Sequence, residues 1–161
     1  MSTSKDVIRY TLGTSDMIVN AYVGDLSDDE LHTPPFEGGN PIAWQLGHIV
    51  VAERGWAESL KLGSSPPLPA GFAEAHTKET SAPNAFPRKY SKDVYMSAWQ
   101  AQRAATSAVL DGLTDEQLDA PTGVDFAPTA FALLNMAGLH ALMHAGQFVA
   151  LRRKLGKPVV I

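Results

Sequence analysis

An internal repeat constrains the fold of this chain more than any other feature of its sequence. Residues 4–46 align without a gap against residues 91–133 at a constant offset of 87 positions, with 12 of 43 aligned residues identical. The segment Ser4-Lys5-Asp6-Val7 recurs at 91–94, and the pattern from Leu26 to Pro34 recurs from Leu113 to Pro121. N-cap and turn residues recur in many helical proteins, but that alone does not explain one constant offset through separate features. The repeat therefore predicts two structurally equivalent helical hairpins.

Each half of the repeat contains two segments with helical apolar spacing, and no window alternates in the manner of a β-strand. The expected helices span residues 4–25, 41–62, 91–112 and 128–155. Serine and asparagine suit N-caps and proline suits the first helical turn, which selects Ser4, Asn40, Pro41, Ser91 and Pro128 as boundary residues. The expected core stripes are Ile8, Leu12, Ile18, Tyr22 and Leu26; Ile42, Leu46, Ile49, Trp56 and Leu60; and Val94, Trp99, Val109 and Leu113.

Two histidines, His140 and His144, stand four residues apart in the apolar stretch 133–148. Residues at this spacing share one helix face, with Cβ atoms about 5–6 Å apart, so two imidazoles can bind one metal ion. His48 is the remaining histidine inside an apolar helical stretch, whereas His32 and His76 lie among expected loop residues. The three histidines therefore form a candidate metal site; a pair of core histidines without a metal is the alternative.

The connector at residues 63–90 is too long for a hairpin turn between adjacent helices. Under the repeat, His48 aligns with Asn135, which precedes the midpoint of the His140 and His144 pair by about 10 Å of helix rise. His48 can lie level with that pair only if the second and fourth helices are antiparallel. The expectation is an all-α four-helix bundle, up-down-down-up, with a long crossover between helices 2 and 3 and a pseudo-two-fold repeat.

Three neutral imidazoles on a divalent ion leave a coordination position open, which is the pattern of catalytic zinc sites. Zinc, nickel and iron(II) all accept such ligands. The chain has no cysteine, which excludes thiolate ligands and disulfides, and Ala141 stands where a zinc protease helix has its glutamate. No catalytic acid or base is assigned.

Trp44 is expected to fill the core, with a wall of the ligand pocket as the alternative, and Met136 and Met143 are expected to pack around the site. Glu53 is expected to pair at the surface rather than to accept an imidazole N–H or act as a base. Asn135 is expected to make a structural hydrogen bond. Gln147 is balanced between orienting a ligand and facing solvent.

Composition indicates one globular domain over residues 1–161, because 45% of residues are apolar and 19% are charged. A net charge of −4 argues against nucleic-acid binding, and the basic residues 152–154 with Lys157 fit the last turn of a helix. No window approaches a membrane span of about 20 apolar residues. The expectation is a cytoplasmic protein with a small-molecule substrate and no nucleic-acid or membrane partner. A homodimer is compatible with an apolar helix face left exposed.

The segment from Pro41 to His48 and the motif His140-x-x-x-His144-x-Gly146-Gln147 resemble the DinB/YfiT-like superfamily of three-histidine four-helix bundles. The resemblance implies that His48, His140 and His144 are the metal ligands. It also implies a metal-dependent enzyme, such as an S-transferase for low-molecular-weight thiols like bacillithiol and mycothiol, or a hydrolase. A non-catalytic metal-binding or stress-response bundle is the alternative. The iron-binding branch of the sulfoxide synthases carries a histidine at the place of Gln45 and an acid at the place of Gly146, so that activity is not expected here.

Overall fold

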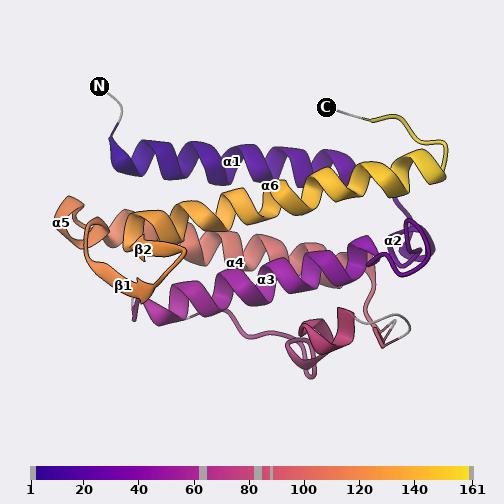
Figure 1. Cartoon of the computed structure of the whole chain (residues 1–161), viewed down its shortest axis with the longest axis horizontal. Coiled ribbons are helices and arrows are strands. Elements are labelled where there is room, and N and C mark those ends of the chain that lie inside the picture. The colour runs from indigo at the N-terminus through magenta and orange to yellow at the C-terminus, as the bar shows by residue number, and fades with distance from the viewer. Residues whose placement is uncertain (1–2, 62–64, 82–84, 88, 160–161) are drawn as a thin grey trace.

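The computed structural model of the chain describes residues 3–61, 65–81, 85–87 and 89–159. Its four long helices pack as a bundle (Figure 1): α1 (Ser4–Val23), α3 (Ile42–Ser59), α4 (Lys92–Gly112) and α6 (Ala130–Lys154). Figure 1 shows that α1 and α6 run in one direction while α3 and α4 run in the opposite direction. Helix α1 packs against α6, and α3 packs against both α4 and α6. The predicted up-down-down-up bundle is therefore confirmed.

The internal repeat corresponds to a repeated structural unit. Between the long helices of each half lies a one-turn helix, α2 (Asp28–Leu31) in the first half and α5 (Asp115–Leu118) in the second. Both begin with a capping box, in which the hydroxyl of Ser27 or Thr114 accepts from the N–H three residues ahead and that residue's side chain accepts in return. The two caps lie 87 residues apart, as the sequence offset requires. The two halves thus share the order long helix, capped turn, long helix.

A short hairpin between α5 and α6 corrects the expectation that the chain contains no strand. Strands β1 (Pro121–Val124) and β2 (Ala127–Thr129) pair in antiparallel fashion, and Gly123 has a positive φ of 74°. Pro128 lies in β2 rather than in the first turn of the helix, which is compatible with a two-stranded sheet that leaves edges free. Helix α6 starts at residue 130, where the Thr129 hydroxyl accepts from a backbone N–H.

Three other boundaries also differ from the sequence expectation. Thr3 rather than Ser4 caps α1, through a capping box with Asp6. Pro41 is itself the N-cap of α3 and no side chain caps that end, so Asn40 is not the cap. Ser91 caps α4 as predicted. Helix α3 stops at residue 59, and its expected end at residue 62 lies outside the described residues.

The connector after α3 runs back along the bundle to the start of α4 (Figure 1). It contains two short 3₁₀ turns, η1 (Glu74–His76) and η2 (Glu79–Ser81), while residues 63–64, 82–84 and 88 of the expected 63–90 span lie outside the described part. Phe72 is fully buried against the bundle, in the same core cluster as residues of α3 and α4. The connector is therefore packed onto the bundle as well as spanning it.

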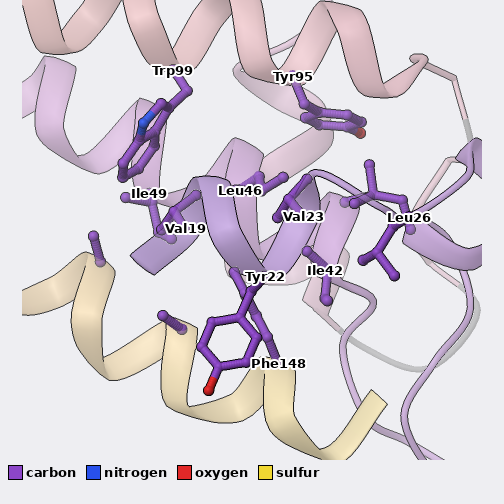
Figure 2. Close-up of a cluster of buried hydrophobic side chains, with 14 of the residues drawn as sticks. Val19, Tyr22, Val23, Leu26, Ile42, Leu46, Ile49, Tyr95, Trp99 and Phe148 are labelled. Carbon is purple, nitrogen blue, oxygen red and sulfur yellow. The ribbon is translucent and has the colours of Figure 1, made fainter. Parts of the chain in front are cut away.

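The larger core cluster contains residues from all four long helices. In Figure 2, Trp99 of α4 lies above Ile49 of α3. Tyr22 of α1 and Phe148 of α6 belong to the same cluster. Most predicted stripe residues are buried, but on α4 the inward position is Tyr95, one residue later than the expected Val94. The error has a physical origin, because the buried face of α4 also carries Gln102, Arg103 and Thr106, which an apolar pattern does not reveal.

Helices α1 and α6 approach each other closely at Gly138, where a Cβ would lie under 3.0 Å from atoms of Thr11. At the C-terminal end of α6, Arg152 is buried and bonds to the Asp25 carboxylate at 2.6 Å and to the Tyr22 carbonyl at 2.8 Å. Arg152 thus ties α6 to the first half of the chain, whereas the sequence suggested only a favourable charge at a helix end. No helix of the described residues is long and apolar enough to cross a membrane.

Candidate metal centre

The bundle brings His48 of α3 together with His140 and His144 of α6. One ring nitrogen from each lies within 4.8 Å of the others. The Nε2 atoms of His140 and His144 are 3.1 Å apart, and the His48 ring centroid lies 5.2 Å from that of His140 and 5.4 Å from that of His144. Because α3 and α6 are antiparallel neighbours, His48 lies at the same height along the bundle as the His140 and His144 pair, as predicted.

The spacing of these nitrogens fits a shared ion. Two nitrogens bound at about 2.0–2.1 Å with a tetrahedral angle between them lie about 3.3 Å apart. The Nε2 atoms of His140 and His144 are 3.1 Å apart, close to that separation. The Nδ1 atom of His140 is buried and has no hydrogen-bond partner in the described part of the chain. Among the described residues, the group that could hold an ion consists of three imidazoles and includes no carboxylate.

Gln45 fixes the proton of His144. Its side-chain oxygen lies 2.9 Å from Nδ1 of His144, and its side-chain nitrogen donates to the Asn40 carbonyl at 2.9 Å. Since that bond commits the amide nitrogen, the amide oxygen must face His144, and Nδ1 of His144 donates to it. The electron pair of Nε2 is then directed into the cluster, as in metal sites where a second group orients a ligating histidine.

No sequence motif assigns Gln45 a role at the site. The available signal is its position three residues before His48, which places both side chains on one face of a helix. Gln45 is also a polar residue, only 2% exposed, in an otherwise apolar run. A buried amide needs hydrogen-bond partners, but its sequence position does not say that one partner is His144.

Aromatic rings surround the cluster. Trp44 stacks on His48, with 4.8 Å between ring centroids and 8° between ring planes. The ring centroid of Trp56 lies 5.3 Å from that of His140. The ring centroid of Phe126, in the hairpin turn, lies 6.2 Å from that of Trp56. Trp44 therefore fills the core, as the sequence suggested, and also covers one face of a histidine of the cluster. These rings give the cluster a largely apolar surrounding.

Burial lowers the pKa of all three histidines. The pKa of His140 falls to about 4 through burial and the nearby His48, and that of His144 falls to about 3 through burial, His140 and His48. The pKa of His48 is also lowered, chiefly by burial. The imidazoles are consequently neutral at pH 7, which is the protonation state that binds a metal ion.

The other expected neighbours differ in burial and in the partners that they bind. Glu53, expected to pair at the surface, is 2% exposed and pairs with Arg103 at 3.1 Å; burial raises its pKa. Gln147 is exposed, and Met143 is 59% exposed and so is not buried packing around the site. Met136 is partly buried. The Oδ1 atom of Asn135 is buried without a hydrogen-bond partner in the described part of the chain, so the expected structural bond is not seen at that atom.

Comparison with known proteins identifies a family. The sequence model of the DinB superfamily matches residues 12–148, which include all three histidines and most of the bundle. No curated protein and no solved structure matches the chain.

Proposed function

This chain belongs to the DinB superfamily, and we propose that it binds one divalent metal ion through His48, His140 and His144 and acts as a metal-dependent enzyme. The observation that carries the proposal is the cluster itself, in which one nitrogen from each ring lies within 4.8 Å of the others. Two helices far apart in the sequence converge there, and burial keeps the rings neutral. Zinc or nickel suits these ligands best, and iron(II) is a third choice.

The chemistry proposed for the site is the transfer of a low-molecular-weight thiol to an electrophile. A divalent ion lowers the pKa of a thiol or water bound to it. Three neutral imidazoles cancel none of the ion's charge, so an anionic fourth ligand such as a thiolate is favoured. The chain's own contribution is to hold the rings: Gln45 orients His144, Trp44 covers one face of His48, and Trp56 packs against His140 in a T-shaped arrangement.

The proposal separates into two tests. The first loads ion-free protein with zinc, nickel or iron(II) and measures bound metal per chain in the wild type and in His48→Ala and His144→Ala. We expect one ion per chain in the wild type and clearly less than one per chain in the variants. Gln147→Ala is the control, because this residue is exposed on the same helix as His144. Absence of stoichiometric binding in the wild type would reject the metal site.

The second test measures activity. Metal-loaded protein is incubated with a panel of small thiols and chlorodinitrobenzene or an epoxide, and conjugate formation is compared with that of His48→Ala. Activity in the wild type alone supports the transferase. If the wild type binds metal but matches the uncatalysed rate for every thiol, the ion has a non-catalytic role in joining α3 to α6.

A further inference from the structure

His76 is bound tightly to the bundle although it belongs to the crossover connector. Its imidazole is 1% exposed, its Nδ1 donates to the Phe72 carbonyl at 2.6 Å, and its Nε2 accepts from the Tyr95 hydroxyl at 3.1 Å. Both ring nitrogens are thus used, and neither remains for an ion. A buried and fully paired histidine in a connector is suited to anchoring that connector.

The surface to which His76 docks is the backbone of α3 at Gly47. A Cβ at position 47 would lie under 3.0 Å from three atoms of the His76 ring, an overlap that no side chain tolerates without movement. Glycine inside a helix costs about 1 kcal/mol relative to alanine, so its presence next to His48 calls for such a packing reason. By contrast, a Cβ at Gly55, in the same helix, would have no neighbouring atom within 4 Å.

Two contacts lead from the docked connector to His48. The backbone of His76 acts on the His48 ring as a hydrogen-bond acceptor would, because it opposes the lowering of the His48 pKa by burial. The second contact passes through Trp44, which stacks on His48 and donates from its indole nitrogen to the Thr80 hydroxyl at 2.9 Å. That hydroxyl in turn lies 2.9 Å from the Ala75 carbonyl, so the connector's own turn fixes it.

We infer that the connector positions His48, with His76 as the anchor on Gly47 and Thr80 as the support of Trp44. Stacking on Trp44 fixes the plane of the His48 ring, and in this proposal the carbonyl of His76 accepts from one ring nitrogen, which leaves the other as the electron-pair donor for an ion. His76 and Thr80 are positioning residues, and their side chains are not members of the cluster. The consequence for metal affinity rests on the proposed function, whereas the consequence for the His48 ring does not.

The test compares Gly47→Ala with Gly55→Ala, the same substitution in the same helix. Metal affinity is measured by competition with a chromophoric chelator, and imidazole ¹H–¹⁵N spectra of the ion-free proteins report the protonated nitrogen of His48. In the wild type and in Gly55→Ala we expect one nitrogen of His48 to carry the proton. In Gly47→Ala we expect loss of that preference and an affinity about 10–100-fold weaker, the usual cost of losing an orienting partner.

Thr80→Val provides a second variant that keeps side-chain shape and removes the acceptor of the Trp44 indole. It is expected to weaken metal binding in the same direction as Gly47→Ala, and it decides the matter if Gly47→Ala does not fold. Wild-type affinity and an unchanged His48 spectrum in a folded Gly47→Ala, or in Thr80→Val if Gly47→Ala is unfolded, would overturn the inference. Failure of the wild type to bind metal would instead reject the proposed function, and the ion-free spectra would still test the positioning of His48.

Discussion

Replacing Gln45 by leucine should weaken metal binding far more than it changes the fold. Leucine has a similar size, so α3 keeps its packing, but Nδ1 of His144 loses the oxygen that lies 2.9 Å away. The proton of His144 is then free to move to Nε2, the atom directed at the other histidines. Loss of an orienting partner typically costs 10–100-fold in metal affinity, or about 1.4–2.7 kcal/mol.

The same substitution also affects the ion-free protein, and the two effects can be separated. A buried donor left without an acceptor costs about 1–3 kcal/mol, and the Asn40 carbonyl loses its donor as well. Urea unfolding without metal measures this loss of stability. Chelator competition at pH 7.5 measures the dissociation constant of the ion from the folded variant.

Two companion variants sharpen the test. Gln45→Glu retains an acceptor for His144, so its metal affinity should stay within about tenfold of the wild type, a smaller loss than the roughly 10–100-fold expected when the partner is removed. Gln147→Leu changes an exposed glutamine on α6 and should bind metal as the wild type does. An unchanged dissociation constant in Gln45→Leu would refute the argument that Gln45 sets the tautomer of His144.

Three further predictions concern stability. Gly138→Ala should lower the free energy of unfolding by about 1–3 kcal/mol, measured in urea, because α1 leaves no room for a Cβ. Gly146→Ala, on the same helix, should raise it by up to about 1 kcal/mol. Equal effects of the two substitutions would contradict this packing. Without metal, the free energy of unfolding should fall as the pH drops below about 6.5. The histidines of the unfolded chain then bind protons, whereas folded His140 and His144, with pKa values of about 4 and about 3, do not. Urea midpoints that do not change between pH 7 and pH 5 would contradict this. Glu53→Ala should lower the free energy of unfolding by about 3–5 kcal/mol, measured in urea, because it leaves Arg103 buried without its partner. The variant should still bind one ion per chain. Loss of the ion from folded Glu53→Ala would place Glu53 in the site.

The topology and the histidine cluster could be predicted because both depend on position along helices. The 87-residue offset makes the halves equivalent, and the spacing between His48 and the His140 and His144 pair selects antiparallel α3 and α6. Helix rise is fixed, so counting residues is enough to decide which residues lie level in a bundle. The structure agrees, with nitrogens of the three rings within 4.8 Å.

The residues that hold the histidines could not be predicted in the same way. Whether Gln45 faces His144 depends on rotamers and on the distance between two helices, neither of which a single-sequence pattern contains. His76 was assigned to a loop, and the docking of a long loop depends on its own turns and on the bare backbone at Gly47. Glu53 was misplaced because a carboxylate is usually exposed, and its burial is made tolerable by Arg103 on another helix.

The proposed metal centre holds one ion through three imidazoles from α3 and α6. X-ray absorption spectroscopy of the zinc-loaded or nickel-loaded protein tests it most directly, because it counts imidazole ligands and measures their distance from the metal. For the zinc form, the account predicts one ion per chain with three imidazole nitrogens at about 2.0–2.1 Å, and two in any ion retained by His48→Ala. Fewer than three imidazoles in the wild type, or a spectrum that His48→Ala leaves unchanged, would contradict it.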